Sequence, residues 1–248
     1  MSSPSLVRLK GSGTTRNIVC PYHAWSYGLD GSLRAARRAD RMPTFDKSGI
    51  CLDQVQVEEF GGMVCVNLDT TAAPLSEQAG DLAADIARWA PDVAVLTHAK
   101  RLTYDVRSNW KNAYDVSGAT VDDHAVWWLW PNTCLLRYPG RGNFMVFQVV
   151  PAGPDRTLET WDFFLETPEL TEAEAQSVSY IDDVLQVQDI ALVESVQRGM
   201  STPAFDQGRI VYDVGGSGLS EHGVHHFHGL VLDAYRSLAG KDTTCPGR

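Results

Sequence analysis

The residues of this 248-residue sequence that most clearly suggest chemistry are Cys20 and His23, in the stretch CPYHAWSY. A thiolate and an imidazole separated by two residues can bind the same small inorganic centre, because Pro21 fixes the bend between them and the aromatic neighbours exclude water. The pair supplies half of a four-ligand metal site. For the pair alone two other interpretations stay open, a buried thiol beside a turn histidine or half of a zinc site.

The sequence around this pair is long enough to resemble a known family. CPYHAWSY, followed by the turn Gly28 to Gly31, resembles the second cluster-binding loop of Rieske non-heme iron oxygenases. In a Rieske [2Fe-2S] cluster two cysteines hold one iron and two histidines hold the other, and each loop gives one of each. The resemblance implies that Cys20 and His23 are cluster ligands.

Four later motifs follow in the order of the same family: NWK, WLWPN, DIALVESVQRG and SEHGVHHFH. Together they resemble most the branch that acts on quaternary amines such as carnitine, glycine betaine or stachydrine. The resemblance implies a mononuclear non-heme Fe(II), held by an H-x4-H pair after NWK and by one carboxylate from a long helix, as an open facial triad. Asp189 matches that carboxylate by its position in DIALVESVQRG. Taken alone, it is also an acid that the dipole favours near a helix N-terminus.

Membership of this family implies a reaction and its partners. The expected reaction is hydroxylation or N-dealkylation of a quaternary amine with dioxygen, and the electrons come from an NAD(P)H-dependent flavin and iron-sulfur reductase. The family also suggests a homo-oligomer, a trimer. An aromatic-ring dihydroxylating dioxygenase is an alternative within the same family.

The sequence departs from the family pattern at both metal sites. Residues 1–19 contain neither Cys nor His, so the C-x-H of the other cluster loop is missing, and no His has another His five positions on. Only the short stretch NAYDVSGATVDDHAV separates Lys111 from Trp127, and its single histidine, His124, is expected at a strand edge. We therefore expect a shortened member, with a late start and an internal deletion, that does not turn over. A non-catalytic truncated paralogue is the alternative.

Composition excludes several other classes of protein. A formal net charge of −10 argues against nucleic acid or an anionic membrane as the main partner. No apolar run reaches the roughly 20 residues that span a bilayer, and the first residues lack a signal peptide's apolar core, so we expect a cytoplasmic protein. Five scattered cysteines indicate reduced thiols. One basic island is either a solvated loop or a docking patch for an acidic electron-transfer partner: Arg34, Arg37, Arg38 and Arg41.

The hydrophobic pattern predicts an α+β fold in three parts. Residues 1–70 form a partial all-β Rieske domain, and residues 71–100 form a linker with one helix over 75–89. Residues 101–248 form a shortened catalytic domain, an antiparallel sheet with helices that is helix-grip-like. Its expected strands are 102–106, 126–132, 134–138, 143–151 and 157–165, and its expected helices start at 171, 188 and 219.

Two further clusters could bind ligands. His222 and His226 lie four apart, on one helical face, and with Glu221 could hold zinc, although packing of this helix is the simpler interpretation. An aromatic group could cage a trimethylammonium by cation-π attraction, although core packing is also open. Its members are Trp127, Trp128, Trp130 and Tyr138. Strand alternation places Trp127 and Trp128 on opposite faces, so only part of the group can face one pocket.

Overall fold

The structure is a computed structural model that describes residues 13–113, 124–138, 142–211, 213–215 and 220–239. The chain divides into two compact units, Met1–Gln78 and Ala79–Arg248. The first contains short strands, and the second contains an antiparallel sheet with helices. This arrangement confirms the predicted α+β class.

Within its described residues, the first unit contains five short strands. Strands β1 (Asn17–Val19), β2 (Ser26–Gly28) and β3 (Leu33–Ala35) form an antiparallel sheet in that order. Strands β4 (Gln56–Phe60) and β5 (Met63–Asn67) form a hairpin. Residues 5–10 are also β-prone in sequence, but they lie outside the described residues.

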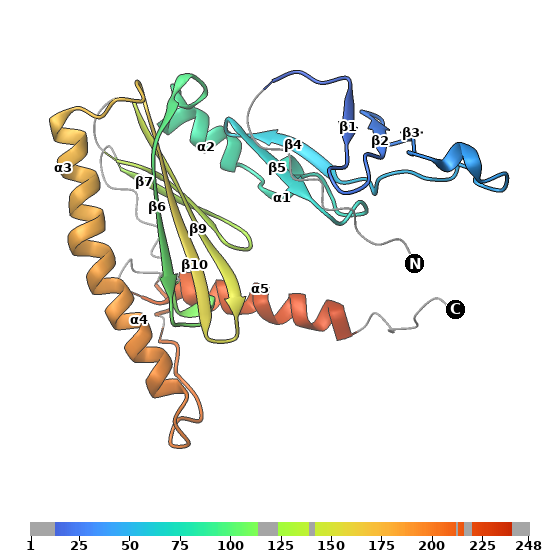
Figure 1. Cartoon of the computed structure of the whole chain (residues 1–248). Coiled ribbons are helices and arrows are strands. Elements are labelled where there is room, and N and C mark those ends of the chain that lie inside the picture. The colour runs from blue at the N-terminus through green and yellow to red at the C-terminus, as the bar shows by residue number, and fades with distance from the viewer. Residues whose placement is uncertain (1–12, 114–123, 139–141, 212, 216–219, 240–248) are drawn as a thin grey trace. The chain divides into compact units, whose positions relative to one another are not determined.

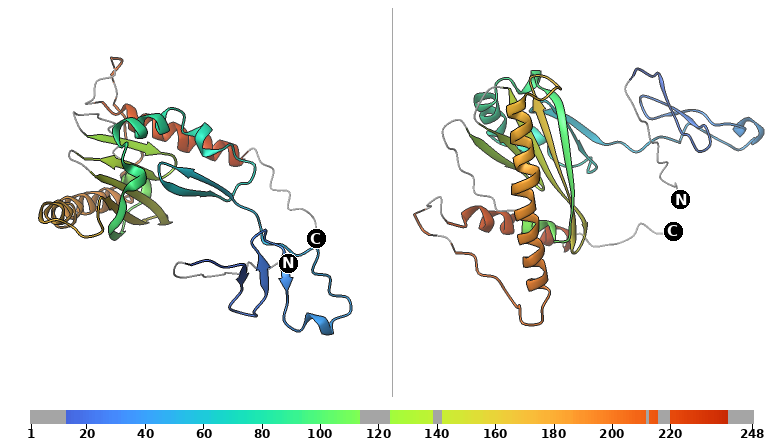
Figure 2. Two further views of the ribbon diagram at one scale, coloured as in Figure 1. Left: turned by 90° about the horizontal axis from the view of Figure 1, so that it is seen from above. Right: turned by 60° about the vertical axis from the view of Figure 1, so that its left-hand side comes forward.

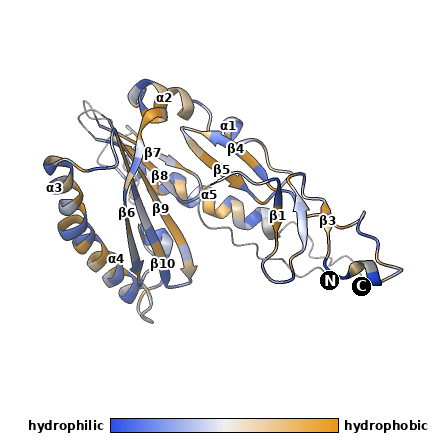
Figure 3. Ribbon diagram, turned by 45° about the horizontal axis from the view of Figure 1, so that its top comes forward, coloured by the Kyte–Doolittle hydropathy of each residue, from blue (hydrophilic) through white to orange (hydrophobic). Residues whose placement is uncertain are grey.

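The hairpin of β4 and β5 turns at Gly61 and Gly62. Both glycines have a positive φ, 56° and 78°, which side chains disfavour. Strand β5 is largely hydrophobic (Figure 3), whereas β4 contains Glu58 and Glu59. The valines of the hairpin, Val57, Val64 and Val66, are each more than half exposed. The hairpin therefore contributes little core of its own.

The prediction of a single helix over residues 75–89 is wrong, because two helices occupy this stretch. Helix α1 (Leu75–Gln78) ends before Gly80, whose φ of +54° lies in the left-handed region, and α2 (Leu82–Trp89) begins after it. Of the residues in these two helices only Ile86, on α2, is buried. Local backbone geometry at a glycine thus outweighs the continuous helical spacing.

A five-stranded antiparallel sheet forms the centre of the second unit (Figure 1). Its strand order is β6-β10-β9-β8-β7. The strands are β6 (Thr97–Val106), β7 (Ala125–Leu129), β8 (Thr133–Arg137), β9 (Asn143–Gly153) and β10 (Arg156–Leu165). All five were expected, but β6 begins at Thr97 rather than at Leu102, because its first residues pair with the end of β10.

A long helical segment crosses one face of this sheet (Figures 1 and 2). It begins at the capping box of Thr171 and Glu174 and comprises α3 (Glu172–Tyr180), a π-helical turn (Ile181–Leu185) and α4 (Gln186–Met200). The expected separation into two helices near residue 188 is wrong. The π turn keeps the chain helical while Val178 and Ile181 stay packed on the sheet.

Helix α5 (His222–Ala239) packs on the same face of the sheet. Its Phe227, 1% exposed, contacts the β9 residue Val149, whereas Val178 of α3 belongs to a cluster with the β9 residue Met145. Residues 145 and 149 share one face of β9, because side chains alternate along a strand. Among the described residues no helix is both long enough and apolar enough to cross a membrane.

Candidate functional site

The first candidate site is the loop that joins β1 to β2. The Cys20 amide donates to the Trp25 carbonyl (2.8 Å), and the Ala24 amide donates to the Cys20 carbonyl (2.9 Å). Ala24 has a φ of 57°, so the loop closes through a left-handed residue. Cys20 is 7% exposed whereas His23 is exposed. The loop therefore presents one sheltered thiol and one solvent-accessible imidazole.

Basic and aromatic side chains surround this loop. The rings of Tyr22 and His23 lie 3.8 Å apart, and the loop lines a depression of about 580 Å³ together with Arg37 and Arg38. Two members of the basic island thus lie beside the histidine. A third, Arg34, instead forms an ion pair with Asp30 at 2.8 Å.

The donors in the first unit do not complete a cluster. A Rieske cluster needs two thiolates and two imidazoles, and this loop provides one of each. In the described ranges no three His, Cys, Asp or Glu side chains come together as a metal site requires. Cys20 and His23 are therefore candidate ligands for half of a cluster.

The second candidate site is the sheet face beneath α4, where the carboxyl groups of Glu159 and Asp189 interact. Glu159 lies on β10 and is 4% exposed, and Asp189 lies in the first turn of α4 and is exposed. Burial, and then the negative charge of Asp189, raise the pKa of Glu159 to about 7. Asp189, the predicted iron ligand, therefore lies opposite a second carboxyl group that the sequence analysis did not identify.

Buried polar groups without hydrogen-bond partners surround these carboxyl groups. Gln186, 4% exposed, precedes Asp189 by three residues on the same helical face, and its Oε1 has no hydrogen-bond partner among the described residues. Trp161, two residues from Glu159 on β10, has a buried Nε1–H that also lacks a hydrogen-bond partner among the described residues. Across the strand pair, Tyr104 opposes Glu159 and donates its hydroxyl to Asp182 (2.8 Å). The space beneath α4 thus contains buried polar groups that the described residues do not satisfy.

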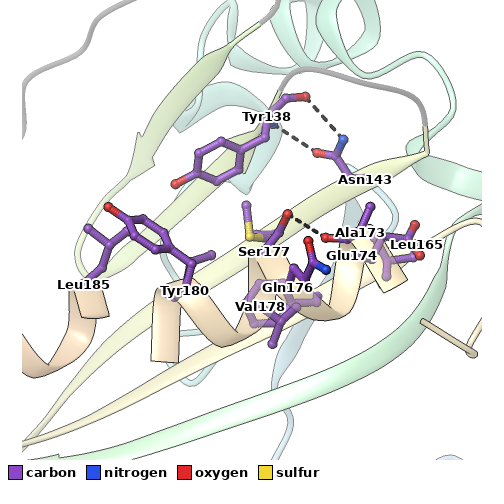
Figure 4. A pocket seen from close by; sticks show the side chains of 13 residues that line it. Tyr138, Asn143, Leu165, Ala173, Glu174, Gln176, Ser177, Val178, Tyr180 and Leu185 are labelled. Atoms are coloured by element: carbon purple, nitrogen blue, oxygen red, sulfur yellow. Dashed lines mark hydrogen bonds between the residues drawn. The ribbon is translucent and has the colours of Figure 1, made fainter. Parts of the chain in front are cut away.

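An open pocket of about 780 Å³ lies beside this region, between α3, the π turn and the sheet (Figure 4). Its lining is mostly apolar, and Tyr138 and Tyr180 are its aromatic residues with hydroxyl groups. The ring of His124 stacks on Tyr138 with a centroid distance of 4.7 Å, and its buried Nε2 has no hydrogen-bond partner in the described part of the chain. His124 lies directly before β7, as expected for a strand-edge histidine.

The opposite face of β10 has a different chemistry. Asp162, 5% exposed, accepts two hydrogen bonds from Arg101 (2.7 and 2.6 Å) and lies 2.7 Å from His98 Nε2. Although burial opposes it, hydrogen bonds from Arg101 and His98 hold the pKa of Asp162 below its ordinary value. Asp162 therefore forms a structural ion pair with Arg101 and His98.

The aromatic group and the C-terminal histidine cluster are the remaining candidate sites. Trp128 packs against Trp130 and Phe227, whereas Trp127 lies near Phe144, so the predicted opposite orientation of Trp127 and Trp128 is confirmed. The indole pair therefore faces the apolar surface of α5. In the C-terminal cluster, the Glu221 carboxylate accepts from the Val211 amide, and His222 lies 3.7 Å from Asp213.

Glu159, Gln186 and Trp161 are the site residues that sequence reasoning missed. One signal was available, because Glu159 is in phase with Trp161 and Phe163 along β10 and so occupies a core-facing position of the strand. A carboxylate in such a phase is unusual unless it is paired. Gln186 had no comparable signal, because its burial depends on the π turn before it.

Two family descriptions match parts of the chain. Residues 5–46 match the Rieske [2Fe-2S] domain, which includes the loop of Cys20 and His23. Residues 119–237 match the catalytic domain of the ring hydroxylating alpha subunit, which includes Glu159 and Asp189. Both matches agree with the resemblance inferred from the sequence motifs.

The chain is similar to oxygenases named for quaternary amines. It is 31% identical to the carnitine monooxygenase oxygenase subunit of Escherichia coli (strain K12), over 92% of this chain and 74% of that protein. It is 30% identical to the chloroplastic choline monooxygenase of Beta vulgaris, over 88% of this chain and 58% of that protein.

Solved structures agree. The apo form of a quaternary ammonium Rieske monooxygenase matches 91% of this chain and 73% of its own, at 31% identity and a TM-score of 0.80. Naphthalene 1,2-dioxygenase from Rhodococcus sp. matches 92% of this chain and 77% of its own with a TM-score of 0.67, at 15% identity, so that likeness shows the fold alone.

The length of the carnitine oxygenase match shows where this chain is shorter. Because 92% of 248 residues is about 228, the matched span of 277 residues contains about 49 positions without a counterpart in this chain. Part of the difference in length thus lies within the matched span. The short stretch between Lys111 and Trp127 is where the sequence motifs place it.

Proposed function

We propose that this chain, which belongs to the family of Rieske oxygenase alpha subunits, binds a quaternary amine and does not turn over by itself. The family uses a [2Fe-2S] cluster and a mononuclear iron. The observation that carries the substrate class is the likeness to a carnitine oxygenase subunit over nine-tenths of this chain.

The roles of individual residues follow from their places in the motifs. Cys20 and His23 would each hold one iron of the cluster, and Asp189 stands at the position of the carboxylate that holds the mononuclear iron in complete members. These are two of the four donors for the first group and one of the three for the second. His124 is the single histidine between NWK and WLWPN, so it cannot provide an H-x4-H pair. Because His124 alone cannot supply the two-histidine part of the iron site, we assign amine binding to the chain and derive no oxidation step.

The partners are proposed on the same basis. A related quaternary ammonium monooxygenase is described with inter-subunit electron transfer, which supports an oligomer, and we propose a trimer. An NAD(P)H-dependent flavin and iron-sulfur reductase would be the electron donor of complete members. Free thiols at Cys20, Cys51 and Cys65 suit the reducing cytoplasm.

A second candidate is a non-catalytic paralogue that associates with an intact subunit. The missing metal donors favour it, and co-expression with a complete relative separates the two cases. Stable co-purification in one oligomer would support association, whereas a homo-oligomer in both preparations would support an independent amine-binding protein.

Calorimetric titration tests the proposed function. The purified chain is titrated with L-carnitine, glycine betaine and choline, and with indole as an uncharged aromatic control. We expect saturable binding of at least one quaternary amine and none of indole. Binding of indole without any amine would instead favour the aromatic-ring branch.

A single-turnover assay tests the second half of the proposal. The chain is reduced chemically, mixed with air-saturated buffer and the amine that binds, and analysed for oxidised amine. We expect none, and one equivalent of product per chain would show that turnover is intact.

A further inference from the structure

Glu159 is a buried carboxyl group that no described residue neutralises. It is 4% exposed, and within the described ranges it has neither a hydrogen bond nor an ion pair. Asp162, three residues further along the same strand and equally buried, has both Arg101 and His98. A buried carboxylate without a counter-charge is strongly unfavourable, so the environment of Glu159 calls for a partner that the described part of the protein does not supply.

The groups around Glu159 narrow the chemistry of that partner. Asp189 adds a second negative charge from α4, and the buried Gln186 Oε1 adds an acceptor without a donor among the described residues. Tyr104, which faces Glu159 from β6, already donates its hydroxyl to Asp182. A partner that stabilises the ionised form of Glu159 must therefore be positive.

An aromatic surface continues from this carboxyl group along the sheet. Trp161 follows Glu159 on the same face of β10 and stacks on Phe147 of β9, with a centroid distance of 4.4 Å. Aromatic faces and carboxylates together suit a large, weakly hydrated organic cation better than a metal ion, which needs several ligands at short distance. No group of three metal-binding side chains is found among the described residues.

We propose that Glu159, assisted by Asp189 and Gln186, is the counter-charge that recognises the ammonium group of a quaternary amine on the sheet face beneath α4. The proposal rests on the proposed function, because that function supplies the substrate class. It adds the residue that distinguishes a charged amine from a neutral molecule of the same shape. Polarised N-methyl groups offer C–H contacts to the carboxylate oxygens and to the Gln186 Oε1.

Choline and 3,3-dimethyl-1-butanol, its neutral carbon isostere, test the proposal as a pair. Calorimetry measures both dissociation constants for the full chain, for Glu159→Gln and for Asp189→Asn. We expect Glu159→Gln to weaken choline binding by about ten- to a hundredfold, because one close charge interaction is lost. Binding of the isostere should change by less than about twofold. Asp189→Asn should weaken choline binding less, because Asp189 is exposed.

Glu169→Gln is the matched control, because it makes the same chemical change at an exposed position, and it should leave both affinities unchanged. Equal choline binding by the chain and by Glu159→Gln would overturn this inference while leaving the proposed function intact. A chain that binds neither choline nor any other quaternary amine would overturn the proposed function, and this inference with it. If circular dichroism shows that Glu159→Gln does not fold, Asp189→Asn decides, and unchanged choline binding by that variant overturns the proposal.

Discussion

Glu159 and Asp162 are two carboxyl groups of strand β10 that are equally buried, at 4% and 5% exposure, but lie on opposite faces of the sheet. Asp162 is held by Arg101 and His98, and hydrogen bonds from these two residues keep its pKa low. Among the described residues Glu159 has only another carboxyl group as a charged neighbour, and burial raises its pKa to about 7. One face of the sheet therefore uses its carboxylate, Asp162, to connect two strands. The carboxyl group of the other face, Glu159, has no oppositely charged partner among the described residues.

The difference between the two faces shows which side of the sheet is suited to ligands. Helices α3, α4 and α5 cover the face of Glu159, whereas the ion pair of Asp162 joins β10 to β6 on the other face. Buried groups that contribute to stability have their partners in the fold. A buried group without one lowers stability, and a function is the usual reason for its retention.

The largest expected effect comes from Glu159→Gln, measured by urea unfolding at pH 5 and pH 8. The folded pKa of Glu159 lies above its ordinary value of 4.5, so the native state binds more protons than the unfolded state between those values. Stability therefore falls as pH rises from about 4.5 to 7, by roughly 3 kcal/mol in all. We expect Glu159→Gln to exceed the parent chain in stability at pH 8 by up to about this amount, with little difference at pH 5.

This account would be contradicted if the free energies of unfolding of the parent chain and of Glu159→Gln differed by the same amount at pH 5 and at pH 8. Glu169→Gln, an exposed change of the same kind, should show no difference at either pH and so controls for net charge.

Asp162→Asn should lower the stability of the protein, whereas Glu159→Gln should raise it. Removing a buried carboxylate from two partners that are half in solvent should cost about 2 kcal/mol at pH 7. Because the folded pKa of Asp162 is below 3.8, its contribution is present above that value and is lost as pH falls through the folded pKa. Chemical unfolding at pH 7 and pH 3 measures this, and an equal cost at both would refute the pairing.

Arg101→Gln should cost about 1 kcal/mol, because it removes one of the two partners of a buried carboxylate. Arg156→Gln is the matched control. Arg156 contacts Asp105 with the same two-bond geometry, at 2.8 and 2.6 Å, but both side chains are more than half exposed. We expect no measurable loss from the control, and equal losses from both variants would mean that burial does not determine the value of the pair.

The fold could largely be predicted from the sequence because its signals are local. Alternating hydrophobic residues and Gly or Pro turns place all five strands of the sheet, and Thr171 with Glu174 marks the start of α3. The failures have tertiary or backbone causes. A left-handed glycine, Gly80, divides the first helix, and a π turn joins two helices that were expected to be separate.

The site could be predicted only where it is contiguous. Cys20 and His23 lie within one short motif and were identified directly, and Asp189 was identified from its motif. Glu159 and Asp189 lie on separate elements, far apart in the sequence, and they interact only because the long helical segment crosses this face of the sheet (Figure 1). The strand phase marks Glu159 as core-facing, but the lack of a partner and the meeting with Asp189 are properties of the packed fold that no local pattern shows.

The iron and sulfide content of the anaerobically reconstituted 248-residue chain, with the EPR spectrum of its reduced form, tests most directly that the fold persists without complete metal sites. We predict a folded protein with less than one iron per chain and no Rieske-type signal, because Cys20 and His23 are two of four cluster donors. Two irons and two sulfides per chain with a Rieske-type signal would contradict this.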